Sequence, residues 1–483
     1  PLVDICNSSF SQGCFPSKNK LAEVIPIHKD GPTEDVTNYR PISLLPAFSK
    51  IMEKLMAKRL STFLELHSIL FPKQFGFRSG YSTTHSLIDI VETIRHSLDN
   101  KKFGCGLFID LKKAFDTVNH DILLTKLEHY GIRDISLQWF KSYLTDRKQY
   151  VSIDGTHSSV RDITCGVPQG SVLGPILFLL YINDLPNISK KLKFFLFADD
   201  TNIYFDSDNL KKLECIMNKE LKKLREWLCI NRLSLNISKT KFILFCPKNK
   251  PKFPINITIN KKPVGETDSI KYLGILLDSN LNFKKHTAEL NKKISRALGI
   301  LYKIRHCVPT SVLLNLYYAT IYPFLLYGIE VWGNTCKTFL QPLLITQKKF
   351  VRMATYNDKF DINLGRYPHS KPLFHDLNIL ELHDIFSVQV AVIVYDHEKG
   401  SKPTTDIIKF TRSNSIHSYP TRYSNSNNFN RPRCNTTQYG LKNLITEGSK
   451  LWTWIPSVIK SLPSKKLFKK KLKKYLINLQ IVP

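Results

Sequence analysis

The sequence is short of acidic residues, of paired cysteines and of long apolar runs, and each shortage excludes a class of protein. Only 40 Asp and Glu oppose 70 Lys and Arg, so the 483 residues carry a formal net charge of +30. This excess indicates a polyanionic partner, with nucleic acid as the leading candidate. The apolar stretches at 176–182 and 390–394 are far shorter than the about 18 residues of a membrane helix, so we expect no membrane partner.

The ten cysteines form no Cys-x-x-Cys pair, and no histidine lies at zinc-finger spacing from two of them. This scatter favours reduced thiols in an intracellular protein over disulfides or a zinc site, so any metal should have oxygen ligands. The N-terminal PLVDICNSSF has neither a basic region nor an apolar stretch, and we expect no signal peptide. The absence of an initiating Met favours a fragment or a processed chain.

Hydrophobic residues make up 42% of the chain and charged residues 23%, which is ordinary for folded globular proteins. Short strand-like and helical patterns alternate up to about residue 277, and the pattern from Phe283 to Tyr356 is mostly helical. We therefore expect an α+β protein divided at 1–277, 278–360 and 361–483. Residues 412–438 contain no acid and read as a polar linker, either merely solvated or in contact with RNA.

Lysines are concentrated near the C-terminus, where eight of them and no acid lie between Lys460 and Lys474. A partial apolar stripe accompanies them and predicts a basic amphipathic helix; it consists of Leu467, Leu472, Leu476 and Leu479. Such a helix can bind phosphates, lie on a membrane surface or simply be solvated. The net charge of the chain favours nucleic acid.

Three aspartates in two short segments carry the chemical argument. Asp110 ends the buried-strand pattern of CGLFID and precedes a helical pattern that stops at Gly131. Asp199 and Asp200 lie between two apolar runs in LKFFLFADDTNIYF, which predicts a β-hairpin with both acids at its tip. An isolated Asp-Asp turn is more often a solvated hairpin. Beside the carboxylate of a neighbouring strand, however, it makes a cradle of hard oxygen ligands suited to Mg²⁺.

The flanking segments strengthen this interpretation. A loop rich in Pro and Gly lies between the two acidic segments, at Gly166–Gly170, and lets a backbone approach a nucleotide closely while Gln169 hydrogen-bonds. Upstream, Lys29 and Arg40 stand in a turn-rich stretch that is suited to holding a triphosphate. No nucleophile–base pair accompanies the acids, which fits phosphoryl transfer.

The order RPISLL, FIDLKKAFDTVNH, GVPQGSVLGPILF, FADD, LSLNISKTK and KYLGI resembles the motif series of reverse transcriptases from non-LTR, LINE-type retrotransposons, jockey-like ones most closely. The resemblance covers nearly the whole chain. It implies a right-hand polymerase with fingers, a palm built on an antiparallel sheet and a helical thumb, followed by a basic C-terminal region. It also implies an RNA-directed DNA polymerase that uses template RNA, a DNA primer or target DNA, deoxynucleoside triphosphates and two Mg²⁺ ions, for which Mn²⁺ can substitute.

The resemblance assigns roles to individual positions. Asp110 and Asp199 would bridge the metal ions, with Asp200 as a less engaged third acid. The positions implied to contact the incoming nucleotide are Lys29, Arg40, Phe115, Gln169 and Gly170, with Phe115 as the gate against ribonucleotides. Those implied to contact template or primer are Arg78, Tyr272, Leu273 and Gly274.

Three further positions belong to the matching motifs. Lys239 is a candidate general acid for the leaving pyrophosphate, although a plain surface lysine explains it nearly as well. Asp116 and His120 of the FDTVNH motif read as structural residues.

Two other functions stay open. A group II intron-type maturase has the same polymerase core, and an inactive or domesticated descendant would only bind RNA; the intact acids argue against the second. The apurinic-type endonuclease of complete elements has no counterpart before Pro1, so the chain should copy RNA without nicking its target. The expected location is the nucleus, with a cytoplasmic ribonucleoprotein stage, and the oligomeric state stays unknown.

Overall fold

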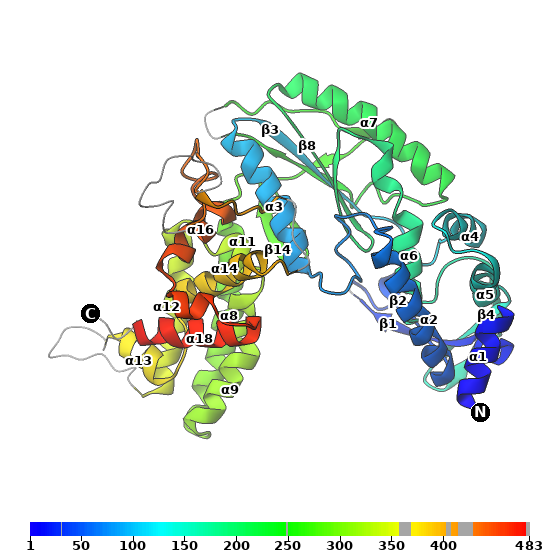
Figure 1. The fold of residues 1–483 in the computed structure, drawn as a ribbon, viewed down its shortest axis with the longest axis horizontal. Helices are drawn as coiled ribbons and strands as arrows, with labels where there is room; N and C mark the ends of the chain where they lie inside the picture. Colours follow the sequence, from blue (N-terminus) through cyan, green and yellow to red (C-terminus); the bar gives the residue numbers. More distant parts are fainter. Residues whose placement is uncertain (30, 248–249, 357–368, 402–406, 414–427, 480–483) are drawn as a thin grey trace.

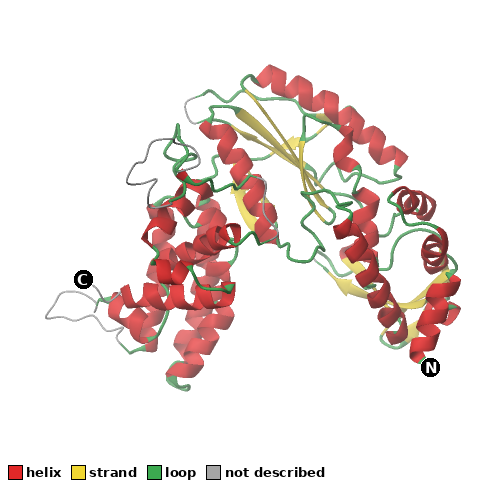
Figure 2. Ribbon diagram, viewed as in Figure 1, coloured by secondary structure: helices red, strands yellow, loops and turns green. Residues whose placement is uncertain are grey.

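The computed structural model describes residues 1–29, 31–247, 250–356, 369–401, 407–413 and 428–479. These residues form an arch (Figure 1), with the N-terminal strands and helices in one lobe, a sheet beneath α7 at the apex and a second lobe of helices. Strands are concentrated in the first lobe and the apex, whereas the second lobe is almost entirely helical (Figure 2). The expected α+β class is therefore confirmed.

The N-terminal lobe packs helices against a sheet of order β2-β1-β4-β5, with β6 also paired to β4. Its strands are β1 (Leu21–His28), β2 (Tyr39–Leu44), β4 (Arg147–Ile153), β5 (Thr156–His157) and β6 (Arg161–Ile163). Its helices are α1 (Leu2–Gln12), α2 (Ala47–Leu66), α4 (His120–His129) and α5 (Asp134–Leu144). The predicted stop of α4 at Gly131 is confirmed, because this glycine has φ +92° just beyond the helix.

The apical sheet has the order β12-β9-β3-β8-β7. Its strands are β3 (Phe103–Ile109), β7 (Lys193–Phe197), β8 (Asp200–Ser207), β9 (Lys241–Phe245) and β12 (Gly265–Glu266). All pairs are antiparallel except the short edge pair β12–β9. Nearby helices are α3 (Thr83–Asp99), α6 (Gly174–Ile182) and α7 (Leu210–Ile230).

The two faces of this sheet belong to different hydrophobic cores, because side chains alternate along each strand. On β3, Leu107 packs into a core that extends from Cys6 to Val264 and includes α6 and α7. Its neighbour Phe108 packs into the other core, which extends from Leu87 to Ile477 and includes α3. Both side chains are less than 9% exposed, so the strand that ends at Asp110 is held from both sides.

Two hairpins flank β12 along the chain: β10–β11 (Thr258–Ile259, Lys262–Pro263) precedes it and β13–β14 (Ser269–Tyr272, Ile275–Asp278) follows it. The helical pattern predicted for 283–356 is confirmed by α8 (Lys284–Ile304), α9 (Thr310–Thr320), α10 (Tyr322–Leu326), α11 (Ile329–Trp332) and α12 (Lys337–Ala354). The C-terminal helices are α13 (Ser370–Asp376), α14 (Leu382–Glu398), α16 (Leu444–Trp454), α17 (Ser457–Lys460) and α18 (Lys465–Leu479). All these helices contribute to or border one core.

The basic C-terminal helix exists as predicted, but its buried face differs from the expected stripe. Leu472 and Leu476 are buried as expected, and Phe468 joins them. Two residues expected in the stripe are not buried: Leu467 is only half-buried, and Leu479, the last residue of the helix, is 43% exposed. Residues 414–427 of the predicted polar linker 412–438 lie outside the described residues.

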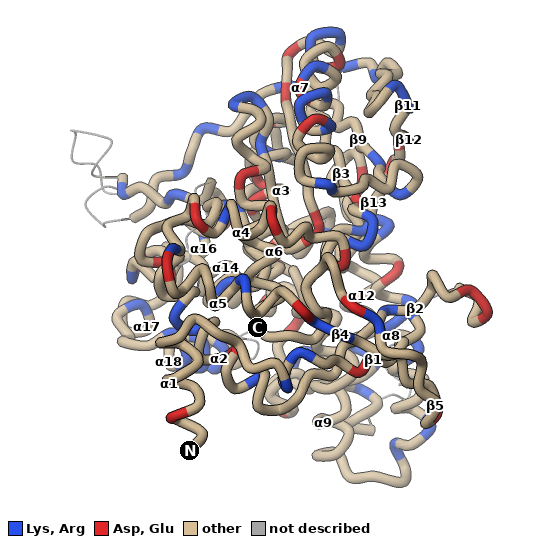
Figure 3. The backbone as a smooth tube through the Cα atoms, turned by 90° about the vertical axis from the view of Figure 1, so that its right-hand side faces the viewer, with Lys and Arg blue, Asp and Glu red and all other residues tan. Residues whose placement is uncertain are grey.

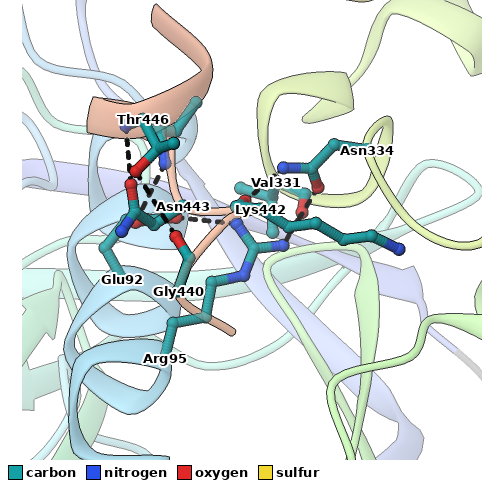
Figure 4. Close-up of polar contacts among 9 residues, drawn as sticks. Glu92, Arg95, Val331, Asn334, Gly440, Lys442, Asn443 and Thr446 are labelled. Atoms are coloured by element: carbon teal, nitrogen blue, oxygen red, sulfur yellow. Dashed lines mark hydrogen bonds and ion pairs between the residues drawn. The ribbon is translucent and has the colours of Figure 1, made fainter. Parts of the chain in front are cut away.

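A buried polar cluster joins α3 to both later parts of the chain (Figure 4). The Arg95 guanidinium pairs with Glu92 at 2.7 Å and donates to the carbonyl of Val331 at 2.8 Å. Glu92 in turn accepts the backbone N–H of Leu444 at 3.1 Å, and the Asn334 amide donates to the Lys442 carbonyl. One helix thereby fixes α11 and the start of α16 together.

Two negative findings complete the fold. All ten cysteines are free thiols. Within the described ranges, no helix combines the length and the apolar character needed to cross a membrane.

Candidate active site

Asp110 is positioned by β3 and by the segment that leads into the neighbouring strand β9. Every residue of β3 is buried, and Asp110 follows immediately. Its backbone N–H donates to the Thr240 hydroxyl at 3.3 Å, and its carbonyl accepts the N–H of Asn236 at 2.8 Å. The NISKTK segment thus holds the backbone of the first acid, a role that the sequence pattern did not reveal.

Asp199 and Asp200 lie at the tip of the β7–β8 hairpin, as predicted. Phe197 pairs with Asp200, so the connection contains only Ala198 and Asp199, and Ala198 has φ +54°. This strained turn is held by the buried Gln74, whose Oε1 accepts the N–H groups of Ala198 at 3.1 Å and Gly76 at 3.0 Å. A side chain at Gly76 would come within 2.4 Å of the Ala198 nitrogen.

The sequence interpretation missed Gln74 and Gly76 as supports of the acidic turn. Their only signal was their position in QFGFRSG, next to Arg78, and no local periodicity links that segment to a hairpin more than 120 residues later.

The register of the sheet brings the three acids together. Ile109 pairs with Thr201, so the next residues along the two antiparallel strands are Asp110 and Asp200. The proximity of these carboxylates affects the pKa values of Asp199 and Asp200. Burial raises the pKa of Asp200 to about 6, and the carboxylates of Asp199 and Asp110 contribute to the rise. Burial also raises the pKa of Asp199, although solvent still reaches both side chains.

Two cations of the first lobe face these acids. Arg40 on β2 and Lys29 just after β1 both lower the pKa of Asp199, against the effects of burial and of Asp110. The Lys29 N–H donates to the Asn38 carbonyl at 2.8 Å, which extends the β1–β2 pairing to this residue. Both side chains are exposed. The structure therefore brings Lys29 and Arg40 within electrostatic reach of the acidic hairpin.

The Gly166–Gly170 loop connects the same elements. The Gln169 amide donates to Asp116 Oδ1 at 2.8 Å, and its backbone carbonyl accepts the N–H of Ser43 on β2 at 2.7 Å. Gly170 has φ +110°, and a Cβ there would come within 2.7 Å of the Ser43 carbonyl oxygen. The His120 Nε2 hydrogen-bonds to the Gly166 carbonyl at 2.7 Å. This contact agrees with the prediction that His120 is a structural residue.

Phe115 lies between the turn after Asp110 and helix α6. Its ring stacks on the buried Phe178 at 4.5 Å between centroids and stays half-buried. Its carbonyl accepts the N–H of Val167 at 2.9 Å, which ties it to the Gly166–Gly170 loop. One face is therefore packed, while part of the side chain remains accessible; its gate role stays a prediction.

The remaining predicted site residues divide into exposed and buried ones. Lys239 is exposed in the turn that holds Asp110, and its N–H donates to Asn236. Tyr272 is buried, with its hydroxyl 2.6 Å from that of Ser86, and burial raises its pKa. Leu273 and Gly274 form the turn of the β13–β14 hairpin. The general-acid and primer-contact roles stay predictions.

Arg78 is engaged within the protein. Its guanidinium pairs with Glu65 at 3.2 Å, donates to the carbonyls of Phe71 and Gln74, and stacks on Tyr81 at 4.3 Å. Only 8% of its side chain is exposed. In this structure Arg78 supports the loop that carries Gln74; a template contact would need the guanidinium to leave these partners.

The donor set suits a divalent ion by chemistry, since three carboxylates supply hard oxygens. The charges of Asp110 and Asp199 raise the pKa of Asp200, and that of Asp110 raises the pKa of Asp199, which places these carboxylates within electrostatic reach of one another. Within the described part of the chain, however, no three or more His, Cys, Asp or Glu side chains already converge as a ligand set.

Comparison with known families agrees with this arrangement. The family model "Reverse transcriptase (RNA-dependent DNA polymerase)" matches residues 27–277, a span from Lys29 and Arg40 through all three acids to the β13–β14 hairpin. The chain belongs to the reverse transcriptase family. The expected right-hand polymerase fold is thereby confirmed, with the apical sheet as the palm.

Several proteins of mobile elements are similar to this reverse transcriptase. The RNA-directed DNA polymerase from mobile element jockey of Drosophila melanogaster is 32% identical over 79% of this chain and 42% of its own length. The probable RNA-directed DNA polymerase from transposon X-element of the same species is 32% identical over 71% and 38%. The expected non-LTR relationship is confirmed, and the chain spans about two fifths of these relatives.

Among solved structures, apo telomerase from Candida tropicalis is similar, with a TM-score of 0.41 and 13% identity over 80% of this chain and 66% of that one.

Proposed function

We propose that this reverse transcriptase is an RNA-directed DNA polymerase that extends a DNA primer on an RNA template from deoxynucleoside triphosphates. One observation carries the proposal: Asp110, Asp199 and Asp200 lie together at the ends of neighbouring strands, within electrostatic reach of Arg40 and Lys29. Carboxylates bind the metal, while the two cations suit the triphosphate. Neither group alone would distinguish catalysis from simple RNA binding.

The acids would hold two Mg²⁺ ions, or Mn²⁺ in their place, which supply activation of the primer hydroxyl and charge stabilisation of the leaving pyrophosphate. The substrate would be bound and oriented by residues of the chain itself. Arg40 and Lys29 would neutralise and orient the triphosphate, while Gln169 and Gly170 present a close backbone surface to the nucleotide. Because phosphoryl transfer needs little covalent help, this positioning suffices.

Asp199→Asn tests the proposal with minimal change in shape. We expect primer extension on poly(rA)/oligo(dT) to fall at least a hundredfold, because a bridging carboxylate and its charge stabilisation, worth several kcal/mol, are lost. RNA binding, measured by anisotropy, should remain within about twofold, because a neutral amide still fits the turn.

Asp208→Asn provides the matched control, since Asp208 is exposed just beyond the other end of β8. Its extension rate should equal that of the parent chain. Extension by Asp199→Asn at a tenth of the parental rate would overturn the metal assignment. RNA binding without extension by the parent chain would favour the non-catalytic RNA-binding alternative.

These substrates would place the chain in the nucleus, where target DNA lies, after a cytoplasmic stage on its RNA. Immunolocalisation of the tagged chain tests this part of the proposal.

A further inference from the structure

A groove of 980 Å³ lies between α9–α10, α13 and α18, in the lobe opposite β1 and β2. We call it the Tyr–Lys groove; its lining residues are Tyr318, Tyr322, His375, Asn378, Leu380, Leu467, Lys470, Lys471, Lys473, Lys474, Ile477 and Asn478. Its volume is at the upper end of the about 300–1,000 Å³ typical of ligand sites. No acidic residue occurs among these described lining residues.

The lysines of α18 fall into two groups. On one side of the helix, Lys465 pairs with Asp396 and Lys469 donates to Gln389. The four groove-lining lysines differ, since none of them forms an ion pair with a described residue; they are Lys470, Lys471, Lys473 and Lys474. Lys473 is half-buried, and burial lowers its pKa. Unneutralised ammonium groups, one of them partly dehydrated, favour binding of an anionic ligand.

Aromatic rings lie beside these charges. Tyr318 and Tyr322 are packed edge to face at 5.2 Å, and Tyr318 remains 42% exposed. The Lys473 Nζ lies 5.7 Å from the centroid of the Tyr322 ring. The Tyr318 ring also packs against Tyr317 at 5.3 Å, and its hydroxyl donates to the Asn378 carbonyl at 3.3 Å, so the ring is held in place while part of it stays accessible. A partly exposed ring next to a row of cations is the combination that binds single strands, because bases stack while phosphates pair with lysines.

We propose that the Tyr–Lys groove is a second nucleic-acid site that binds a single strand, separate from the polymerase site. α9, α13 and α18 lie together at the far end of the helical lobe, whereas β3 and β8 lie at the apex (Figure 1). Basic residues occur throughout the chain with acids among them (Figure 3), so charge alone would not single out this surface. What singles it out is the combination of a groove, a partly exposed tyrosine and lysines that form no ion pair with described residues.

The structure disfavours the membrane-surface interpretation of α18. A membrane-bound amphipathic helix needs a free apolar face. Phe468, Leu472 and Leu476 form that face here, and they are buried in the protein core. The exposed side of the helix offers lysines and not an apolar surface.

Fluorescence anisotropy on the full chain tests the proposal with unstructured 20-nucleotide RNA and, separately, DNA of the same length. The assay contains no primer, deoxynucleotide or divalent ion, so its result does not depend on polymerase activity. For Lys470→Ala/Lys473→Ala/Lys474→Ala, we expect weaker binding and a slope of log K against log salt that is shallower by about 2, since each single-strand contact contributes about 0.7. The two arms show whether RNA or DNA is the better ligand.

Tyr318→Ala should weaken binding about fivefold or more through lost stacking, whereas Tyr318→Phe keeps the ring and should bind as the parent does. The charge-matched control is Lys211→Ala/Lys212→Ala/Lys222→Ala on α7, whose lysines are exposed outside the groove. It should leave the salt slope within 0.5 of the parental value. Thermal unfolding confirms that each variant is folded.

In a second measurement, RNA that contains 4-thiouridine should crosslink to peptides with Tyr318 or residues 467–478. An unchanged slope in the groove variant, or an equal loss in the α7 control, would overturn the proposal. So would loss of binding to phosphatidylserine vesicles or to an acidic peptide without loss of oligonucleotide binding, because the groove would then serve a membrane or a protein.

Discussion

At the residue scale, the Phe115 ring is packed on one face and partly exposed elsewhere. A test of its role must therefore separate an effect on stability from an effect on nucleotide choice. One ring face is fixed by Phe178, while the side chain remains half-buried next to the loop that carries Gln169. A residue that only filled the core would be enclosed. Partial exposure next to this loop leaves the ring able to contact a nucleotide sugar.

We expect Phe115→Val to raise the incorporation of ribonucleotides relative to deoxynucleotides tenfold or more, or about 1.4 kcal/mol of lost discrimination. A smaller side chain leaves room for the 2′-hydroxyl. Competitive single-nucleotide extension measures the ratio. Phe178→Leu removes the ring on which Phe115 stacks, so it should lower stability without changing the ratio of ribonucleotide to deoxynucleotide incorporation. A folded Phe115→Val enzyme with the parental ratio would contradict the gate role.

Glu330 is a buried acid outside the polymerase site. It is 9% exposed on α11, and its Oε2 has no hydrogen-bond partner among the described residues. Burial raises its pKa to about 7, and Lys469 offsets only part of the rise. The folded state therefore holds a proton that the unfolded state releases near pH 4.5.

The folded chain binds more protons between pH 4.5 and 7, so stability should fall as the pH rises through this window. Glu330→Gln lacks this titration. We expect the variant to exceed the parent in stability above pH 7, by up to about 3 kcal/mol, and the difference to vanish toward pH 4.5. Thermal unfolding at pH 5 and pH 8 measures it. A difference that does not depend on pH would show that Glu330 is ionised in the folded chain.

At the scale of the element, the Gly166–Gly170 loop connects the N-terminal lobe to the turn that follows the central strand of the apical sheet. It bonds to β2 through Gln169 and Ser43 and to the turn after Asp110 through Asp116. Displacing it would therefore move the nucleotide-facing surface relative to both the cations and the acids.

Gly170→Ala should displace the loop, because its Cβ would meet the Ser43 carbonyl at 2.7 Å in a backbone of φ +110°. We expect primer extension to fall tenfold or more, with a stability loss of about 1–3 kcal/mol. Gly155→Ala is the matched control, since it has φ +80° but nothing within 4 Å. It should lose less stability, because only the backbone strain applies there, and it should keep its activity. Equal activity losses in both variants would point to general strain.

The sequence predicted the elements that carry the acids better than the contacts between them. Asp110 follows a wholly apolar strand, and Asp199 and Asp200 interrupt two apolar runs, so local patterning sufficed. Gln74 supports the acidic turn from 124 residues away, and no periodicity encodes such a contact. The β13–β14 turn was hidden for another reason: Leu273 occupies φ +42°, a conformation that a leucine rarely adopts.

At the scale of the whole molecule, the C-terminal region packs against the polymerase. Besides Glu92 and Arg95, the Asp99 carboxylate at the end of α3 accepts the N–H and the hydroxyl of Thr436 at 2.8 and 2.7 Å. The proposed divisions 278–360 and 361–483 share one core. We therefore expect the helical lobe to unfold cooperatively with α3.

Arg95→Ala should lower stability by about 3–5 kcal/mol, because it leaves the carboxylate of Glu92 buried without its partner. Both groups are less than 8% exposed. The surface pair of Lys293 and Glu289, at 2.8 Å and about 40% exposed, provides the comparison. Lys293→Ala should cost about 0.5 kcal/mol or less. Denaturant titration measures both, and similar losses would mean that the Arg95 cluster contributes little.

The division of the palm sheet between two cores also orders events during biosynthesis. The core on one face is complete once Val264 has been made, whereas the other face needs residues up to Ile477. At about 5–20 residues per second, the ribosome needs roughly 10–40 s for the difference. During that interval Phe108, Phe195 and Phe245 would lack their final cover. The newly made strand that precedes Asp110 should therefore bind chaperones until the segment up to Ile477 has been made and has folded.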